Sequence, residues 1–309
     1  MSQRDGAQER GSGTPPTCDE ARARLLAAIP ATERRLELAG VSTAVLDGGD
    51  GPPLVVLHGG GQFAATWIRV IPPLMATHRV VAPDLPGHGA SEVQDGRLDA
   101  DRVLAWLDEL IEQSCPSPPA LVGHTLGGAI AARYAIGHGE RISLLVLVDA
   151  LGLGPFHPVP RFALAMVGFL ARPTEHTRDR FLGQCILDLE GVHDQMGEDW
   201  ESIATCGLDA ARTPSKKAAG RSLMKAFGVS AIPQAELARI RVPTALIWGR
   251  HDLQAGLRVA EAASARYGWP LHVIEDCGVD PNVEQPHAFL DALRAELDGR
   301  RPVHRRNRL

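Results

Sequence analysis

The chain has 309 residues, of which 44% are hydrophobic and 22% are charged, so it can bury a large core. Its formal net charge of -5 argues against an electropositive surface that binds nucleic acid. The longest apolar stretch, residues 162–171, is about half as long as a membrane span. We therefore expect neither a nucleic acid nor a membrane as a partner.

The five cysteines are scattered along the chain, are odd in number and form no CxxC pair. This usage is typical of reduced thiols in a cytosolic protein rather than of a disulfide or zinc framework. Residues 1–20 are polar and rich in glycine, lack the apolar segment of a secretory signal, and predict a disordered tail. The sequence predicts a cytoplasmic protein with no metal and no cofactor. The cysteines are Cys18, Cys115, Cys185, Cys206 and Cys277.

Apolar segments alternate with helical ones from about residue 34 onward, which predicts an α/β fold with a mostly parallel sheet wrapped by helices. Several of these segments are continuous apolar runs, as expected for strands that are covered on both faces. Apolar residues at helical spacing predict helices over residues 100–113 and 282–297. The predicted strands are residues 35–38, 41–46, 54–57, 79–82, 120–122, 144–148, 244–248 and 271–274.

The alternation breaks between residues 151 and 237, where the chain predicts several helices joined by proline and glycine. Such an insertion would lie over the carboxyl edge of the sheet, where open α/β sheets bind ligands, and we interpret it as a helical cap. Its apolar stretch, residues 162–170, either lines a pocket or packs the cap onto the core. The predicted parts are a tail (1–20), a first core segment (21–150), the cap (151–237), a second core segment (238–299) and a basic tail (300–309).

Residues 123–128, Gly-His-Thr-Leu-Gly-Gly, follow an apolar run and lead into a helix of small residues. This pattern is typical of a nucleophile elbow, a sharp turn from strand to helix that holds one side chain above the sheet. The side chain held there is Thr125, where serine is usual. An elbow residue is strained toward positive φ, which a β-branched side chain disfavours. The sequence therefore predicts the turn, but it leaves open which reaction a threonine at this position supports.

Three further motifs accompany the elbow: residues 57–61 (Leu-His-Gly-Gly-Gly), residues 83–91 (Pro-Asp-Leu-Pro-Gly-His-Gly-Ala-Ser) and residues 242–252, which end in Gly-Arg-His-Asp. In this order they resemble the α/β-hydrolase superfamily, and most of all its capped carbon–carbon hydrolase, haloperoxidase-like and epoxide-hydrolase-like members. The resemblance covers about residues 36–297. It implies an α/β-hydrolase fold with a helical cap, and nucleophilic catalysis at a carbonyl.

The resemblance also implies roles for individual residues. Thr125 takes the nucleophile's position and Asp252 that of the triad acid, although Asp252 could instead cap the helix that starts near residue 254. The backbone N–H groups of Gly60 (or Gly61) and Leu126 would form an oxyanion hole. Histidines at these motif positions either touch the substrate or orient loops through hydrogen bonds. The same two roles are open to His88. The positions implied around the substrate are His58, Gly59, Gly61, His124 and Val279.

The chain departs from the family at its general base. The family has Gly-His-x-Pro-x-x-Glu-x-Pro-x-x-Phe before the last helix, and residues 278–289 match every anchor except the histidine, which is Val279. Valine has no lone pair and no titratable proton, so it cannot deprotonate Thr125. A replacement base could come from Asp280, from His287 or from a cap histidine, at position 157, 176 or 193. Cys277 is interpreted as a small buried hydrophobe.

Three functional hypotheses follow. The favoured one is an atypical enzyme that uses the oxyanion hole without a Ser-His-Asp triad. It would perform elimination, cyclisation or carbon–carbon or ester cleavage on a small hydrophobic or carbonyl-containing molecule. The second is an ordinary ester hydrolase in which Thr125 attacks and a relocated residue supplies the base. The third is a ligand-binding member without catalysis. The sequence does not identify the substrate, and it leaves a homodimer open.

Overall fold

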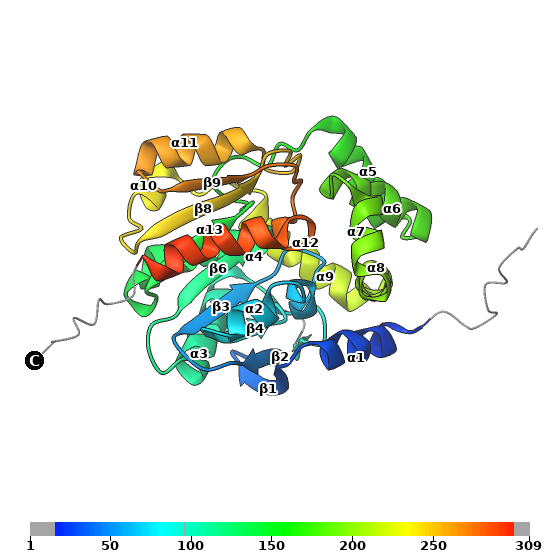
Figure 1. The fold of residues 1–309 in the computed structure, drawn as a ribbon, viewed down its shortest axis with the longest axis horizontal. Helices are drawn as coiled ribbons and strands as arrows, with labels where there is room; N and C mark the ends of the chain where they lie inside the picture. The colour runs from blue at the N-terminus through cyan, green and yellow to red at the C-terminus, as the bar shows by residue number, and fades with distance from the viewer. Residues whose placement is uncertain (1–15, 96, 300–309) are drawn as a thin grey trace, which may run out of the picture.

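The predicted mostly parallel sheet wrapped by helices is confirmed in the computed structural model, which describes residues 16–95 and 97–299 (Figure 1). The described part of the sheet has nine strands in the order β1-β2-β4-β3-β6-β7-β8-β9, with β5 paired to β2. The strands from β4 to β9 along this path run parallel, whereas β2 pairs antiparallel with β1, β4 and β5. The basic tail, residues 300–309, lies outside the described residues, as do residues 1–15 of the predicted N-terminal tail.

All eight predicted strands are present, with ends that differ by at most three residues. The two-residue strand β5 was not predicted, because two residues carry no measurable alternation. The strands are β1 Thr32–Leu38, β2 Val41–Gly48, β3 Pro53–Leu57, β4 Arg79–Pro83, β5 Glu92–Val93, β6 Ala120–His124, β7 Leu144–Val148, β8 Thr244–Gly249 and β9 Leu271–Ile274.

The central strands are buried on both faces, which explains their continuous apolar runs. Successive residues of a strand point to opposite faces, so Val55 and Leu57 enter one core whereas Leu54 and Val56 enter the other. Helices α3 Ala100–Ser114, α4 Thr125–His138 and α11 Leu257–Tyr267 pack into the first core. Helices α1 Cys18–Ala28, α2 Ile71–Met75 and α13 Pro286–Asp298 pack into the second.

Between β7 and β8 the chain forms a helical insertion, and its green helices lie together at one side of the sheet in Figure 1. No described helix, here or in the core, combines the length and apolarity that crossing a membrane requires. The insertion consists of α5 Pro160–Ala171, α6 Glu175–Cys185, α7 Leu189–Met196, α8 Glu198–Arg212, α9 Pro214–Leu223, a π-turn at Met224–Gly228 and α10 Gln234–Leu237.

Two helix predictions need correction. The single helix predicted over 282–297 is two helices, α12 Pro281–Glu284 and α13, which meet at Gln285. Pro286 has no N–H and forces the residue before it out of the helical region, so Gln285 adopts φ -129° and ψ 59°. Helix α1, which was not predicted, begins at Cys18 inside the predicted tail, because Thr17 and Glu20 form a capping box there.

The expectation of reduced cysteines is wrong for one pair. Cys18 of α1 and Cys206 of α8 form a disulfide, with their Cα atoms 4.7 Å apart, whereas Cys115, Cys185 and Cys277 are free. The two cysteines are 188 residues apart in sequence, and only the packing of α1 against α8 brings them together. The cytoplasmic expectation rested partly on this cysteine usage and loses that support.

We expect reduction of this disulfide to lower the free energy of unfolding by about 2–5 kcal/mol, because the bond closes a long loop in the unfolded chain. Urea unfolding with and without dithiothreitol measures the change. Replacing Cys18→Ser together with Cys206→Ser should give a protein with the lower stability and no response to the reductant. An unchanged unfolding midpoint in reduced wild-type protein would contradict the expectation.

Candidate functional site

The turn between β6 and α4 has the predicted elbow geometry. Thr125 adopts φ 43°, in the left-handed region that costs a β-branched residue most. A Cβ atom on Gly123 would lie 2.5 Å from the carbonyl oxygen of Gly127, so this sharp turn requires glycine there. The Thr125 side chain is nearly buried, and its hydroxyl makes no hydrogen bond within the described residues. The strain therefore holds an unengaged hydroxyl at the carboxyl edge of the sheet.

Gly59 is the point where three polar side chains meet. A Cβ atom built on Gly59 would lie 2.4 Å from Oγ1 of Thr125, 2.9 Å from Oε1 of Gln62 and 3.1 Å from Nδ1 of His124. Any side chain at this position would displace all three groups. Gly59 therefore acts by leaving space around the elbow, and its own N–H is occupied because it donates to Oε1 of Gln62 at 2.9 Å.

His124 connects the elbow to the loop after β9. Its Nε2 donates to the backbone carbonyl of Val279 at 2.7 Å, and its Nδ1 lies 3.2 Å from Oε1 of Gln62. A carboxylate oxygen of Asp280 lies 3.5 Å from Nε2. Both ring nitrogens thus face oxygen atoms of neighbouring residues. His124 is buried and engaged on both sides.

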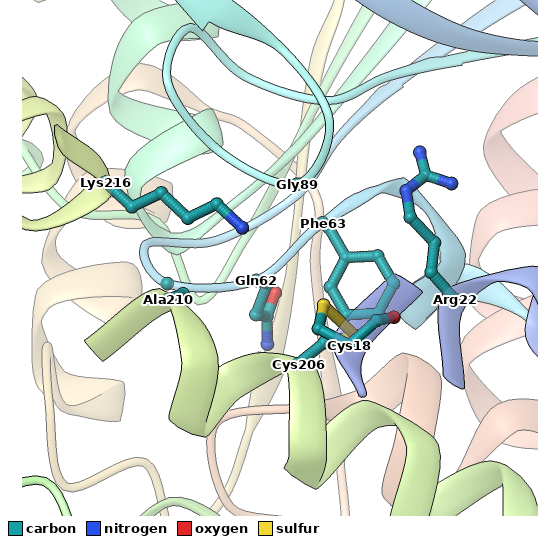
Figure 2. Close-up of a pocket in the computed structure, with 9 residues that line it drawn as sticks. Cys18, Arg22, Gln62, Phe63, Gly89, Cys206, Ala210 and Lys216 are labelled. Atoms are coloured by element: carbon teal, nitrogen blue, oxygen red, sulfur yellow. A yellow bond between two sulfur atoms is a disulfide. The ribbon is translucent and has the colours of Figure 1, made fainter. Parts of the chain in front are cut away.

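Asp280 is held from the glycine-rich loop as well. Its Oδ1 accepts a hydrogen bond of 2.6 Å from Nε2 of Gln62, whereas its Oδ2 makes none within the described residues. Gln62 therefore joins Gly59, His124 and Asp280 in one network. On its other side the loop of Gln62 borders a hollow, shown in Figure 2, with the disulfide and Lys216. Lys216 is itself paired with Asp209.

Glu284 of α12 fixes the backbone of this loop. Its Oε1 accepts from the N–H groups of Gly278 and Asp280, and its Oε2 accepts from Leu187 of the helical insertion at 2.7 Å. Burial raises the pKa of Glu284 to about 7, against the lowering effect of these hydrogen bonds. A second contact to the insertion comes from the N–H of Val279, which donates to the carbonyl of Cys185 at 2.8 Å.

Asp252 is engaged by the loop that follows it, but it does not cap a helix as the alternative supposed, because α11 begins only at Leu257 and has no side-chain cap. Its two oxygens accept from the N–H groups of residues 254, 255 and 256 and from Nε1 of Trp248. Burial raises its pKa in spite of these donors. Because the carboxylate is already engaged at both oxygens, it is not free to orient a further side chain.

Asp149 is a buried acid that the sequence analysis did not single out. It follows β7, adopts φ 41°, and accepts from the Gly249 N–H at 2.9 Å through Oδ1. Its Oδ2 is buried without a hydrogen-bond partner. Burial and then the charge of Asp252 raise the pKa of Asp149 well above its usual range. The positive φ is the local feature that marks Asp149, and only the structure shows it.

Two backbone donors lie near the elbow, one in α4 and one in the glycine-rich loop. Leu126 is the second residue of α4, so its N–H has no acceptor within the helix, and the N–H of Gly60 donates to no described residue. A Cβ atom on Gly60 would meet the Leu126 side chain at 3.5 Å, which shows how close the two residues lie. Gly61 adopts φ 75° and faces open space.

His58 is a loop-orienting residue in this geometry. Its ring is fully buried, its Nδ1 donates to the Gly59 carbonyl at 2.8 Å, and its Nε2 accepts from the Leu85 N–H at 2.9 Å. Burial and the neighbouring His88 lower its pKa to about 3, so the ring stays neutral. Both nitrogens are occupied, which leaves none for a substrate, and His88 is likewise buried against this ring.

The other residues weighed as a replacement base lie away from this network. His287 is exposed on α13, and the three histidines of the insertion are exposed as well. Cys277 is fully buried, and burial raises the pKa of its thiol far above the usual value. Asp280 alone of these candidates lies in the network of Gln62 and His124. The three exposed histidines are His157, His176 and His193.

The apolar stretch of the insertion divides into two faces. Phe162 packs with Val279, Val283 and Trp200, and Phe169 packs with Leu208 in a second small cluster. Met166 is partly buried against the first cluster. Phe162 and Phe169 therefore pack the insertion, and Phe162 contacts the loop that carries Asp280. No group of acidic, histidine or cysteine side chains in residues 16–95 and 97–299 is arranged to hold a metal ion.

A model of the alpha/beta hydrolase family matches residues 54–292. The chain belongs to the alpha/beta hydrolase family. It is 30% identical over 279 residues to a 2-hydroxymuconate semialdehyde hydrolase of Pseudomonas sp. strain CF600, covering 84% of this chain and 92% of that protein. It is 25% identical to a 2-hydroxy-6-oxo-6-(2'-aminophenyl)hexa-2,4-dienoic acid hydrolase of Metapseudomonas resinovorans, covering 88% and 93%.

Solved structures agree on the fold. The 2-hydroxy-6-oxo-6-phenylhexa-2,4-dienoate hydrolase of Rhodococcus sp. strain RHA1 superposes with a TM-score of 0.76 at 23% identity, over 87% of this chain and 99% of that one. A putative hydrolase of Bacillus subtilis gives 0.77 at 19% identity, over 90% and 96%. The two curated relatives named above are thus hydrolases.

We expect Glu284 to contribute a stability term to this alpha/beta hydrolase that falls as the pH rises from about 4.5 to 7. The unfolded chain releases this proton near its usual pKa of 4.5 and the folded chain near 7, so the folded state holds more protons in between. The stabilisation from Glu284 is fully present below its unfolded-state pKa of 4.5, and it is lost as the pH rises through the folded-state pKa of about 7. The size of this change is on the order of 3 kcal/mol.

Urea unfolding across this pH range measures the free energy of unfolding of wild type and of Glu284→Gln. The difference between the two isolates Glu284, because the opposite pH dependence that His58 contributes is the same in both proteins. Glu261→Gln, which changes an exposed glutamate of α11, is the control and should parallel wild type. Parallel pH profiles of wild type and Glu284→Gln would contradict the expectation.

Proposed function

We propose that this alpha/beta hydrolase is an atypical enzyme that acts on a small hydrophobic carbonyl compound without a Ser-His-Asp triad. The observation that carries the proposal is that no base among the described residues contacts the hydroxyl of Thr125 at the elbow. Val279 contributes a carbonyl, not a base, and His124 donates to it, while the Thr125 hydroxyl has no partner that could take its proton. Asp252 is engaged locally and offers no free oxygen for a relay. These contacts favour chemistry that does not begin with attack by Thr125.

The proposed reaction uses two elements of the site. The N–H groups of Gly60 and Leu126 would donate to the substrate's carbonyl oxygen as it gains negative charge, and one such donor is worth roughly 10²–10³ in rate. Asp280 would accept a proton from the carbon next to the carbonyl, leaving an enolate. Gln62 and His124 fix its Oδ1 side, which leaves Oδ2 to face the substrate.

The substrates named for the two curated relatives support this substrate class. They hydrolyse dienoates that carry keto or aldehyde groups, which are small carbonyl compounds. Enolate formation next to a carbonyl is a common first step toward elimination, cyclisation and carbon–carbon cleavage. The ordinary ester hydrolase with a relocated base is the second candidate. Asp280 would then have to activate Thr125, and no contact joins the two side chains. A ligand binder without catalysis is the third.

We expect little hydrolysis of para-nitrophenyl acetate by the wild-type protein near neutral pH, because no base contacts Thr125. Thr125→Ser with Val279→His should raise the rate above either single variant, because the serine hydroxyl and the base that takes its proton must both be present. The release of para-nitrophenol by purified protein measures this. A wild-type rate typical of esterases that Thr125→Ala abolishes would favour the second candidate.

We expect the wild-type protein to exchange hydrogen for deuterium next to the carbonyl of aryl alkyl ketones in deuterium oxide, as mass spectrometry detects. Asp280→Asn should lower the exchange rate by about 10²–10⁴-fold, because the amide cannot accept the proton. Thr125→Ala should retain most of it.

Asp276→Asn is the matched control for this exchange. It removes a carboxylate from the same loop at an exposed position, and asparagine tolerates its φ of 48°. Equal rates in Asp280→Asn and Asp276→Asn would reject Asp280 as the base. Saturable ketone binding with no exchange would support the ligand-binding alternative.

A further inference from the structure

Helix α5 of the insertion has an exposed apolar stripe, made of Leu164, Val167 and Leu170. Their exposed fractions are 64%, 58% and 49%. The three residues are spaced three apart and so lie on one side of the helix. The other side of α5 buries Phe162, Ala165 and Phe169 within the insertion. In Figure 1, α5 and α6 lie at the outer edge of the molecule, on the side away from the sheet.

Cationic groups flank the stripe at both ends. Arg161 is exposed at the start of α5 and Arg172 is exposed just past its end. Lys217 reaches the same end, where its ammonium donates to the Leu170 carbonyl at 3.3 Å, and Arg212 donates to the carbonyl of Pro173. No acidic residue occurs between positions 160 and 174. The acidic groups beyond this end are Glu175, Asp179 (paired with Arg178) and Asp209 (paired with Lys216).

This local charge is opposite to that of the whole chain, which carries a formal net charge of -5. A negatively charged molecule would be repelled by the average surface and attracted to the two ends of α5. The occupant that matches the stripe therefore combines an apolar interior with negative charges around it. An anionic lipid surface has these two properties, because its acyl chains lie directly below its charged headgroups.

A second copy of this chain fits the stripe less well. A helix of twelve residues is about 18 Å long and 10 Å wide, so its outer side offers about 180 Å² per copy, against about 800 Å² in a stable dimer. Two copies would also bring Arg161 and Arg172 of one against like charges of the other. A bilayer needs no such area, because a few apolar side chains and a basic rim act together.

We propose that α5 is a docking surface for an anionic membrane, with Leu164, Val167 and Leu170 inserted among the lipid headgroups and Arg161, Arg172 and Lys217 at the headgroup charges. The chain binds on the membrane and does not cross it, in keeping with the absence of a spanning helix among the described residues. The expectation of no membrane partner rested on hydropathy along the sequence, and this proposal departs from it. The stripe lies on the opposite side of α5 from Phe162, which packs against the loop of Asp280, so docking leaves that contact in place.

Sedimentation with large vesicles tests the proposal. The wild-type protein should bind vesicles of phosphatidylglycerol mixed with phosphatidylcholine, bind pure phosphatidylcholine far less, and be released at about 0.5 M salt, where exposed charges are screened. Replacing Leu164, Val167 and Leu170 together by serine should weaken binding by about tenfold or more. Arg161→Gln with Arg172→Gln should weaken it on anionic vesicles only.

Leu187→Ser with Val229→Ser is the matched control, because it removes two side chains that are equally exposed, at 51% and 52%, but lie outside α5. This variant should bind vesicles as the wild type does, and all variants should keep the wild-type unfolding midpoint because the changed side chains are exposed. No vesicle binding by wild type, or equal binding by the stripe variant, would overturn the proposal. A dimer in analytical ultracentrifugation that the stripe variant dissociates, without vesicle binding, would assign the surface to a second copy.

Discussion

The hydrogen bond from the His124 ring to the Val279 carbonyl joins the strained turn at the start of α4 to the loop that follows β9. These two segments are 155 residues apart, and the rest of the site depends on their distance. With the ring fixed on this side, Gln62 can meet it on the other and reach Asp280. Gly59 provides the space in which these groups and the Thr125 hydroxyl lie together. A histidine side chain in the place of Val279 would have to share this space with a loop that is already bonded to the elbow.

Four buried acidic side chains lie in or near this network. Asp149, Asp252, Asp280 and Glu284 are all buried and lie within electrostatic reach of one another. Burial raises the pKa of Asp149, Asp252 and Glu284, because a buried carboxylate loses the hydration that water would supply. The protein offsets this cost with backbone donors at Asp252 and Glu284, whereas one oxygen of Asp149 remains unpartnered. Strain at φ 41° and an unpaired oxygen in one residue mark Asp149 as an acid that tertiary packing holds in place.

The helical insertion and the core depend on each other through a few polar contacts and one covalent link. Glu284 accepts from Leu187, the N–H of Val279 donates to Cys185, and the disulfide joins α8 to α1. The first two contacts involve the same loop that carries Asp280, so the position of the insertion and that of the proposed base are coupled. The insertion also exposes one side of its most apolar helix, α5, opposite the side that buries Phe162.

Local patterns in the sequence were sufficient for the sheet and for the turn at Thr125, because each depends on residues close together in the chain. Continuous apolar runs predicted strands covered on both faces, and the glycines at 123 and 127 predicted the turn at Thr125. The sequence could not show that Asp252 is engaged by its own turn, that Gln62 bridges three residues, or that Cys18 meets Cys206. It also could not say which side of the stretch 162–170 is buried, since both sides are apolar. Those features depend on which distant segments pack together, and only the tertiary structure sets the distances that hydrogen bonds and burial require.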